Sequence, residues 1–249
     1  MQYLGGKSRT YSSICTFLES VRKPNQTFVE PFCGACWVTQ GMSGNRHASD
    51  ANQALVNLHK AIQQGWQPPT DVTQDTYSLY AREQNPDDPM TAFLGFGCSF
   101  AGKWFGGFAR SNDRNYASNA KNSLMKKAPR LACVKFSHRQ YQRVDVSGAL
   151  IYCDPPYDNT TGYGAVGEFD SGGFWATMRD WAARNTVVVS EYAAPADFVC
   201  VLEIGTKTDM HTKSGKAKRI EKLFMHESQA PHNLRVVPDL FRDATKGLK

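Results

Sequence analysis

Two stretches near the amino terminus repeat apolar residues three or four positions apart. This spacing places the apolar side chains on one face of a helix. The first stretch is residues 12–21 and the second is residues 52–64. The repeating apolar positions are Ile14, Phe17, Leu18 and Val21 in the first stretch and Leu55, Val56, Leu58 and Ile62 in the second. We therefore expect two amphipathic helices, each with one buried face.

Short apolar runs lie between and beyond these helices. Residues 149–152 and 186–190 are runs of the kind that forms buried strands. Further strands are expected at residues 27–30 and, with a more polar sequence, at residues 46–50. A further helical pattern occupies residues 174–183. The alternation of strands and helices predicts an α/β fold with a parallel sheet.

The alternation is interrupted in the middle of the chain. From the Gly-Trp-Gln-Pro-Pro segment at residues 65–69 to about Asp145, short helical patterns replace it. These patterns cover residues 75–84, 89–94 and 117–128, and a run of glycines and aromatic residues fills 95–108. We therefore predict one α/β domain formed by residues 1–60 and 146–249, with a helical insert at residues 61–145.

Composition narrows the possible classes of protein. A chain of 249 residues with 41% apolar content can form one large domain, or one domain that carries an insert. No apolar run reaches about 18 residues, so no membrane-spanning helix is expected, and the first residues lack the apolar stretch of a signal peptide. Seven scattered cysteines suit a reducing compartment. The sequence thus predicts a cytoplasmic protein.

The net charge of +6 is concentrated in the insert. Between residues 100 and 145 there are ten basic residues and only two acidic ones, Asp113 and Asp145, which gives a local net charge of +8. The basic residues are Lys103, Arg110, Arg114, Lys121, Lys126, Lys127, Arg130, Lys135, Arg139 and Arg143, and the aromatic residues among them are Trp104, Phe105, Phe108 and Tyr116. A solvated basic face is the simpler explanation, but cations interleaved with rings favour a nucleic-acid partner.

An acid stands where the strand at residues 149–152 stops. Asp154 is followed by Pro155 and Pro156, which cannot donate to a sheet ladder, and then by Tyr157. Ligands of open α/β sheets bind at this carboxyl edge. Asp154 is therefore a candidate functional residue, and the alternative is a plain turn in which Tyr157 only packs.

The strand at residues 27–30 enters a turn of small residues that contains Gly34, and we expect a helix after it. Helix N–H groups and a glycine would then lie beside a ligand. Asp50, about 20 residues beyond Glu30, has the offset of an acid that binds ribose hydroxyls. An ordinary strand-helix-strand unit with a surface aspartate remains the alternative. Cys33 and Cys36 have no partner pair of ligands in the sequence, so neither a metal site nor a redox site is expected.

The segment Asp154-Pro155-Pro156-Tyr157 resembles the catalytic motif of the amino-group DNA methyltransferases. The order of motifs from Tyr3 to about Phe224 resembles the Dam-type (alpha-group) adenine methyltransferases, including phage-encoded members. The resemblance implies a Rossmann-like S-adenosylmethionine-dependent methyltransferase sheet, mainly parallel and seven-stranded with one antiparallel strand. It also implies that the helical insert recognises the target. Cys36 and Trp37 depart from the family pattern, which has small residues there.

The resemblance also implies roles for individual residues. Asp154, Pro155, Pro156 and Tyr157 would be catalytic, with Asp154 and the Pro155 carbonyl accepting the N–H groups of the target amine and Tyr157 stacking on the flipped base. The residues implied to bind S-adenosylmethionine are Tyr3, Lys7, Glu30, Phe32, Gly34, Asp50 and Asp154. The residues expected to contact DNA are Lys103, Arg110, Arg114, Lys121, Lys126, Lys127 and Arg130.

The sequence and the resemblance together predict transfer of a methyl group to the exocyclic amine of adenine in double-stranded DNA, without a metal. We expect a monomer, with a dimer as the alternative, in a restriction-modification or bacteriophage setting; a phage enzyme would act in the host cytoplasm. The basic segment at residues 206–222 is either a second phosphate contact or a solvated tail. Alternative functions are methylation of cytosine, RNA or protein glutamine by the same fold, or DNA binding without catalysis.

Overall fold

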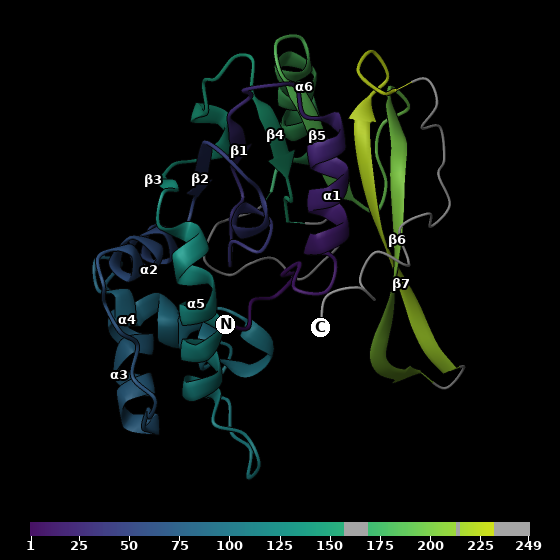
Figure 1. The fold of residues 1–249 in the computed structure, drawn as a ribbon. Coiled ribbons are helices and arrows are strands. Elements are labelled where there is room, and N and C mark those ends of the chain that lie inside the picture. Colours follow the sequence, from purple (N-terminus) through teal and green to yellow (C-terminus); the bar gives the residue numbers. More distant parts are fainter. Residues whose placement is uncertain (157–168, 213–214, 232–249) are drawn as a thin grey trace.

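Seven strands form one mixed sheet in the order β3-β2-β1-β4-β5-β7-β6 (Figure 1). The computed structural model describes residues 1–156, 169–212 and 215–231. The strands are β1 (Phe28–Glu30), β2 (Arg46–Asp50), β3 (Lys135–His138), β4 (Leu150–Cys153), β5 (Thr186–Glu191), β6 (Phe198–Thr212) and β7 (Gly215–His226). The first five strands in this order, from β3 through β2, β1 and β4 to β5, pair in parallel. Strand β7 pairs antiparallel with both β5 and β6. The predicted Rossmann-like α/β sheet with an antiparallel strand is confirmed.

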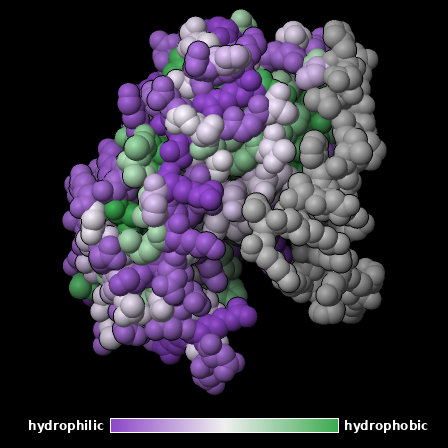
Figure 2. All heavy atoms as spheres, viewed as in Figure 1, coloured by the Kyte–Doolittle hydropathy of each residue, from purple (hydrophilic) through white to green (hydrophobic). Residues whose placement is uncertain are grey.

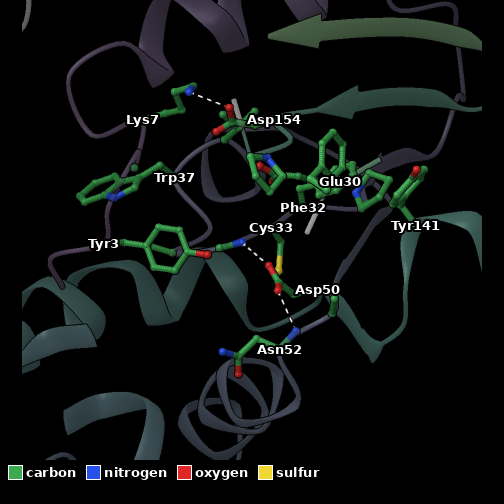
Figure 3. Close-up of a pocket in the computed structure, with 18 of the residues that line it drawn as sticks. Tyr3, Lys7, Glu30, Phe32, Cys33, Trp37, Asp50, Asn52, Tyr141 and Asp154 are labelled. Carbon is green, nitrogen blue, oxygen red and sulfur yellow. Dashed lines mark hydrogen bonds and ion pairs between the residues drawn. The ribbon is translucent and has the colours of Figure 1, made fainter. Parts of the chain in front are cut away.

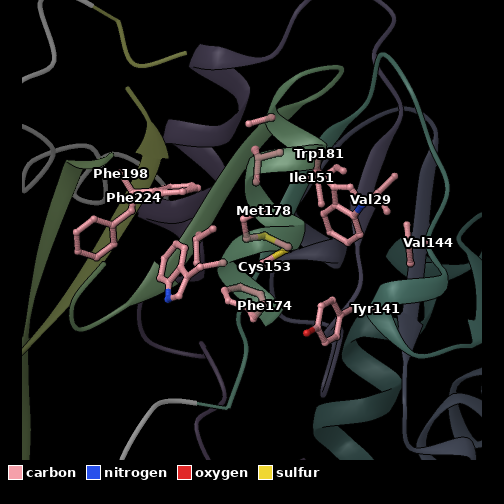
Figure 4. Close-up of a cluster of buried hydrophobic side chains, with 14 of the residues drawn as sticks. Val29, Tyr141, Val144, Ile151, Cys153, Phe174, Met178, Trp181, Phe198 and Phe224 are labelled. Atoms are coloured by element: carbon pink, nitrogen blue, oxygen red, sulfur yellow. The ribbon is translucent and has the colours of Figure 1, made fainter. Parts of the chain in front are cut away.

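Helices cover both faces of the central strands. Alternate strand residues point to opposite faces, so Phe28, Leu150 and Val188 pack with α1 (Tyr11–Val21). The neighbouring residues Val29, Ile151 and Val187 pack with α6 (Ser171–Ala182). Figure 4 shows Val29 and Ile151 beside Trp181 of that helix. Burial on both faces explains why these strands are continuous apolar runs in the sequence.

The helical region has a core of its own. It consists of α2 (Gln53–Gln63), α3 (Gln74–Glu83), α4 (Pro89–Ala92), a π-helical turn (Phe93–Gly97) and α5 (Tyr116–Leu131). These elements gather beside β2 and β3 in Figure 1 and bury Tyr77, Phe93, Leu94 and Leu124 together. Figure 2 shows that the outer face of this region is mostly hydrophilic. No helix in the described part of the chain is long and apolar enough to cross a membrane.

The sequence predicts no strand between residues 61 and 145, whereas β3 lies there. Residues 135–138 pair in parallel with β2 and form the edge of the main sheet. Both ends of β3 are exposed, so it lacks the apolar run that marks a buried strand. The segment from residue 135 therefore belongs to the sheet, and the division into a catalytic domain and an insert stays a prediction apart from this boundary.

The helix expected after Gly34 is also absent. Residues 31–38 form turns, and only a 3₁₀ turn (Thr39–Gly41) follows them. Gly34 and Cys36 both have positive φ angles, of 45° and 56°, which an α-helix does not accept. The chain therefore leaves β1 through an irregular loop, which we call the cofactor loop (residues 33–37).

Candidate active site

A cavity of about 350 Å³ opens at the carboxyl edge of the parallel strands (Figure 3). Its walls come from the first residues of the chain, from the ends of β1, β2 and β4, and from the helical region. It brings together all seven positions that the sequence predicts to bind the cofactor: Tyr3, Lys7, Glu30, Phe32, Gly34, Asp50 and Asp154. The volume is within the range of small-molecule sites. Ligand binding by these residues stays a prediction.

Asp50 ends β2 and joins it to the cofactor loop. Its Oδ2 accepts a hydrogen bond from the Gly34 N–H at 2.9 Å, and its Oδ1 accepts one from the Asn52 N–H at 2.9 Å. Burial raises the pKa of Asp50 above its ordinary value, although these two N–H donors act to lower it. Each carboxylate oxygen has two lone pairs, so Asp50 can also accept hydroxyl donors from a ligand in the cavity.

Gly34 lies under the ring of Tyr3. A Cβ atom at position 34 would stand 2.9 Å from that ring, and φ is +45°, so any other residue would both clash and be strained. Tyr3 in turn packs on Phe96 of the helical region, with ring centroids 4.7 Å apart. The cofactor loop therefore follows the cavity wall with its backbone close to any ligand.

Glu30 ends β1 and is buried. Its Oε2 accepts hydrogen bonds from the Thr39 N–H, at 2.8 Å, and from the Thr39 hydroxyl. Burial raises the pKa of Glu30 well above its ordinary value, and the Thr39 donors only partly offset this. A cationic ligand group in the cavity would stabilise the ionised form of this side chain.

Lys7 connects Asp154 to a carboxylate on β7, which is two strands away from β4 in the sheet. Its Nζ lies 2.7 Å from Asp154 Oδ1 and 3.2 Å from Glu221 Oε1, and the Ser190 hydroxyl donates to Glu221. Burial alone would lower the pKa of Lys7, but the two carboxylates raise it above its ordinary value. Lys7 is therefore a cation that holds Asp154 in one orientation at the cavity wall.

Sequence reasoning misses Glu221 because its role depends on strand pairing. Glu221 belongs to β7, which pairs with β5 next to β4. In the sequence it is one acid inside a basic segment, and no local pattern marks it. Only the sheet brings residues 7, 154 and 221 together.

Asp154 and Pro156 line the cavity directly after β4, while Pro155 is buried behind them. The sequence prediction that an acid and two prolines follow the end of a buried strand agrees with this placement. Tyr157 and the polar loop after it lie outside the described residues.

Further residues of the cavity wall lie after β3 and just before α6. They are Gln140, Tyr141, Gln142, Phe169 and Asp170. The ring of Tyr141 lies 5.1 Å from that of Phe32, centroid to centroid, so the two form an aromatic wall. The rule that places ligands at carboxyl strand ends would have marked residues 140–142, had β3 been predicted.

Lys127 does not lie on the surface, which corrects its prediction as a DNA contact. Its side chain is only 2% exposed, its Nζ donates to the Ala35 carbonyl, and it lies 4.5 Å from the centre of the Trp37 ring. Helical periodicity explains this, because residues 117, 120, 124, 127 and 131 share the buried face of α5. The other predicted DNA contacts are exposed, except Lys121, which is half-buried.

The aromatic residues of the basic segment differ from expectation in the same way. Trp104, Phe105 and Phe108 are partly buried against the core of the helical region. Phe100, which the sequence does not single out, is 67% exposed. The ring most available for stacking is therefore that of Phe100.

The described residues contain no group of three or more His, Cys, Asp or Glu side chains that could hold a metal ion. Cys33 and Cys36 are buried free thiols of the cofactor loop itself. Cys36 Sγ lies 3.3 Å from His59 Nε2, which also lies 2.9 Å from the Gly34 carbonyl oxygen. This cluster supports the loop from behind.

Residues 3–91 match a family model described as D12 class N6 adenine-specific DNA methyltransferase. The matched part contains Tyr3, Lys7, the cofactor loop and Asp50, but it does not reach Asp154. Among proteins with curated descriptions, none matches the sequence. The match supports methyltransferase chemistry of the adenine-modifying kind.

Solved structures resemble the chain only distantly. A provisionally named RNA methyltransferase from Pyrococcus horikoshii is 7% identical, with a TM-score of 0.39 over 86% of this chain and 79% of that one. The rRNA methyltransferase aviRa from Streptomyces viridochromogenes is 13% identical, with a TM-score of 0.35 over 88% and 86%. A provisionally named methyltransferase complexed with SAH is 11% identical, with a TM-score of 0.34 over 89% and 54%. Likeness at this level bears on neither substrate nor mechanism.

Proposed function

We propose that this chain transfers the methyl group of S-adenosylmethionine to the exocyclic amine of adenine in double-stranded DNA. The observation that carries the proposal is one cavity in which the Asp-Pro-Pro segment after β4 meets the cofactor loop and Asp50. The family match of residues 3–91, which contain the cofactor loop and Asp50 but not Asp154, supports the same chemistry. The finer assignment is to Dam-type, phage-like enzymes that act in the cytoplasm, without a metal, as monomers or dimers.

The cavity residues fit S-adenosylmethionine. Asp50 can accept ribose hydroxyls, because its oxygens keep lone pairs beside the Gly34 and Asn52 donors. Phe32 and Tyr141 offer an apolar wall to a purine ring, and Glu30 offers a carboxyl group to a cation. When bound, S-adenosylmethionine supplies a methyl group that is already activated by a sulfonium, so orientation provides most of the remaining catalysis.

Asp154 is proposed to orient the target amine. The lone pair of that nitrogen is delocalised into the adenine ring, which makes the amine a weak nucleophile. Hydrogen bonds from its two N–H groups to the Asp154 carboxylate and the Pro155 carbonyl would direct the lone pair at the methyl group. Lys7 and Glu221 keep Asp154 in place. Tyr157, which lies outside the described residues, is proposed to stack on the flipped base.

The exposed basic residues of the helical region are proposed to bind the DNA backbone. Lys103, Arg110, Arg114, Lys126 and Arg130 are all exposed, and Phe100 adds an exposed ring. Cations that neutralise phosphates supply sequence-independent affinity, and rings stack on exposed bases. Restriction-modification or protection of phage DNA are the settings in which such an enzyme would act.

The experiment measures transfer of a labelled methyl group to unmethylated duplex DNA, RNA, and protein. We expect label on adenine in DNA, and we expect Asp154→Asn to reduce the rate by at least about 100-fold. The matched control is Asp180→Asn, which removes an exposed carboxylate on α6 and should leave the rate unchanged. Label on cytosine, RNA or protein would contradict the substrate. An Asp154→Asn rate within twofold of wild type would remove Asp154 from the mechanism.

A further inference from the structure

The cofactor loop lacks the support that a following helix would give. Gly34 and Cys36 both adopt left-handed backbone conformations. Such a conformation is strained for Cys36, because Cys36 carries a Cβ atom and glycine does not. The turn inside the loop and the 3₁₀ turn after it bond the Cys33 and Cys36 carbonyls, to the Cys36 and Gln40 N–H groups, but not the carbonyls of Gly34 and Ala35. Contacts from other elements must therefore hold the loop in the shape that lines the cavity.

Two side chains from the helical region contact the loop carbonyls. His59 Nε2 of α2 lies 2.9 Å from the Gly34 carbonyl oxygen, and Lys127 Nζ of α5 donates to the Ala35 carbonyl. The Lys127 ammonium also lies 4.5 Å from the centre of the Trp37 ring. Gly34, Ala35 and Trp37 line the cavity on their other side. Lys127 therefore touches the back of the cavity wall.

Burying a lysine at position 127 costs folding free energy. Lys127 shares its helix face with Ala120, Leu124 and Leu131, and no carboxylate among the described residues forms an ion pair with it. Burial lowers the pKa of Lys127 to about 8, although Cys36, Cys33 and Glu30 act to raise it. A buried charge without a paired carboxylate destabilises a fold, and an apolar side chain of similar length would avoid this. Residues that lower the stability of a fold in this way concentrate at functional sites.

We propose that Lys127 is a positioning residue for the cofactor loop and thereby sets the affinity for S-adenosylmethionine. Its ammonium fixes the Ala35 carbonyl and the Trp37 ring, which keeps the Gly34 N–H on Asp50. The inference rests on the proposed function, because it assumes that the cavity binds this cofactor. It gives the two adjacent lysines of α5 separate roles, since Lys126 is exposed and Lys127 is buried.

The test compares Lys127→Met with Lys126→Met, its neighbour on the same helix. Calorimetry measures S-adenosylmethionine affinity without DNA, and fluorescence anisotropy measures affinity for a DNA duplex. We expect Lys127→Met to weaken cofactor binding by about tenfold or more, the usual effect of losing a charge-assisted hydrogen bond, with DNA affinity unchanged. Lys126→Met should weaken DNA binding and leave cofactor affinity unchanged.

Thermal melting separates positioning from a structural role. Replacing the buried charge with an apolar side chain should leave the melting temperature equal or higher, even while cofactor affinity falls. A role in folding alone would instead lower the melting temperature. Lys127→Gln, which keeps an N–H donor without the charge, should lie between wild type and Lys127→Met in cofactor affinity.

The pH dependence of cofactor affinity, compared between wild type and Lys127→Met, gives a second measurement. As pH rises from 7 to 9, Lys127 loses its proton, so cofactor affinity should fall more steeply than in Lys127→Met. Stability should change in the opposite sense, because a folded-state pKa below that of the unfolded chain favours folding as pH rises. The titratable groups that face Lys127 are the Glu30 carboxyl, the Cys33 and Cys36 thiols, the His59 ring and the Met1 amine.

The outcomes distinguish the two levels of the proposal. Equal cofactor affinity in wild type and Lys127→Met, or parallel loss of cofactor affinity, DNA affinity and melting temperature, would overturn the role of Lys127 alone. No binding of S-adenosylmethionine by the wild-type protein would overturn the proposed function and this inference with it.

Discussion

Single residues in the cavity both hold the fold together and line the cavity, and Asp50 is the clearest example. Its carboxylate accepts hydrogen bonds from the N–H groups of Gly34 in the cofactor loop and of Asn52. Asp50 also lines the cavity, where its remaining lone pairs can accept further donors. Lys7 is similar, since it pairs with Asp154 and Glu221 at the same time. Replacing such a residue removes a structural contact and, under the proposed function, a ligand contact as well.

We expect Asp50→Ala to weaken S-adenosylmethionine binding by about 10- to 100-fold, because hydrogen bonds to a carboxylate are stronger than neutral ones. DNA affinity should stay the same, since the exposed basic residues lie on other elements. Calorimetry with the cofactor checks this prediction. Asp75→Asn, which removes an exposed acid from the first turn of α3, is the control. Unchanged cofactor affinity in Asp50→Ala would exclude the ribose assignment.

At the scale of elements, α5 presents opposite chemistry on its two faces. Its buried face carries Ala117, Ala120, Leu124, Lys127 and Leu131, and it contacts both the cofactor loop and the core of the helical region. Lys126 and Arg130 occupy the exposed face. The helix contacts the cavity wall on one side, and under the proposed function its other side binds DNA.

Neutralising the exposed face should change the salt dependence of DNA binding. In Lys126→Gln/Arg130→Gln, we expect the slope of log affinity against log salt to flatten by up to about 1.8, at about 0.9 for each lost phosphate contact. The control is Lys23→Gln/Arg184→Gln, which removes two exposed charges at the amino ends of the strands, opposite the cavity. Equal slopes in the two double variants would move the DNA path away from α5.

At the scale of the whole molecule, the cavity joins parts of the chain that are distant in sequence. Tyr3 and Lys7 come from the first residues, Asp50 and Asp154 from two strand ends, and Trp104 from the helical region. A ligand that contacts all of them binds only the folded chain. Cofactor binding and global stability should therefore be linked.

We expect S-adenosylmethionine at about 100 times its Kd to stabilise the protein by about 2.7 kcal/mol. For a chain of this length, that should raise the melting temperature by about 5–10 °C. Differential scanning fluorimetry across a cofactor series measures the shift. Adenosine at the same concentrations serves as a weaker-binding comparison. A melting temperature that does not respond to cofactor would contradict binding in this cavity.

Local patterns in the sequence determined the central strands, the helices and the acids at the strand ends. Burial on both faces of a strand, or on one face of a helix, imposes a periodicity that a reader can recognise. For this reason Asp50 and Asp154 were identifiable at the carboxyl edge before the structure was known. The same reasoning failed for β3, because an exposed edge strand carries no apolar run.

Only the tertiary structure decided which charges share a site. Glu221 reaches Lys7 because β7 pairs with β5, and Lys127 reaches Ala35 because α5 packs behind the cofactor loop. Helical periodicity places Lys127 on the apolar face of α5 and Lys126 off it, but the periodicity does not say which carbonyl Lys127 meets. Contacts between distant segments depend on packing in three dimensions, and no local spacing of residues encodes them.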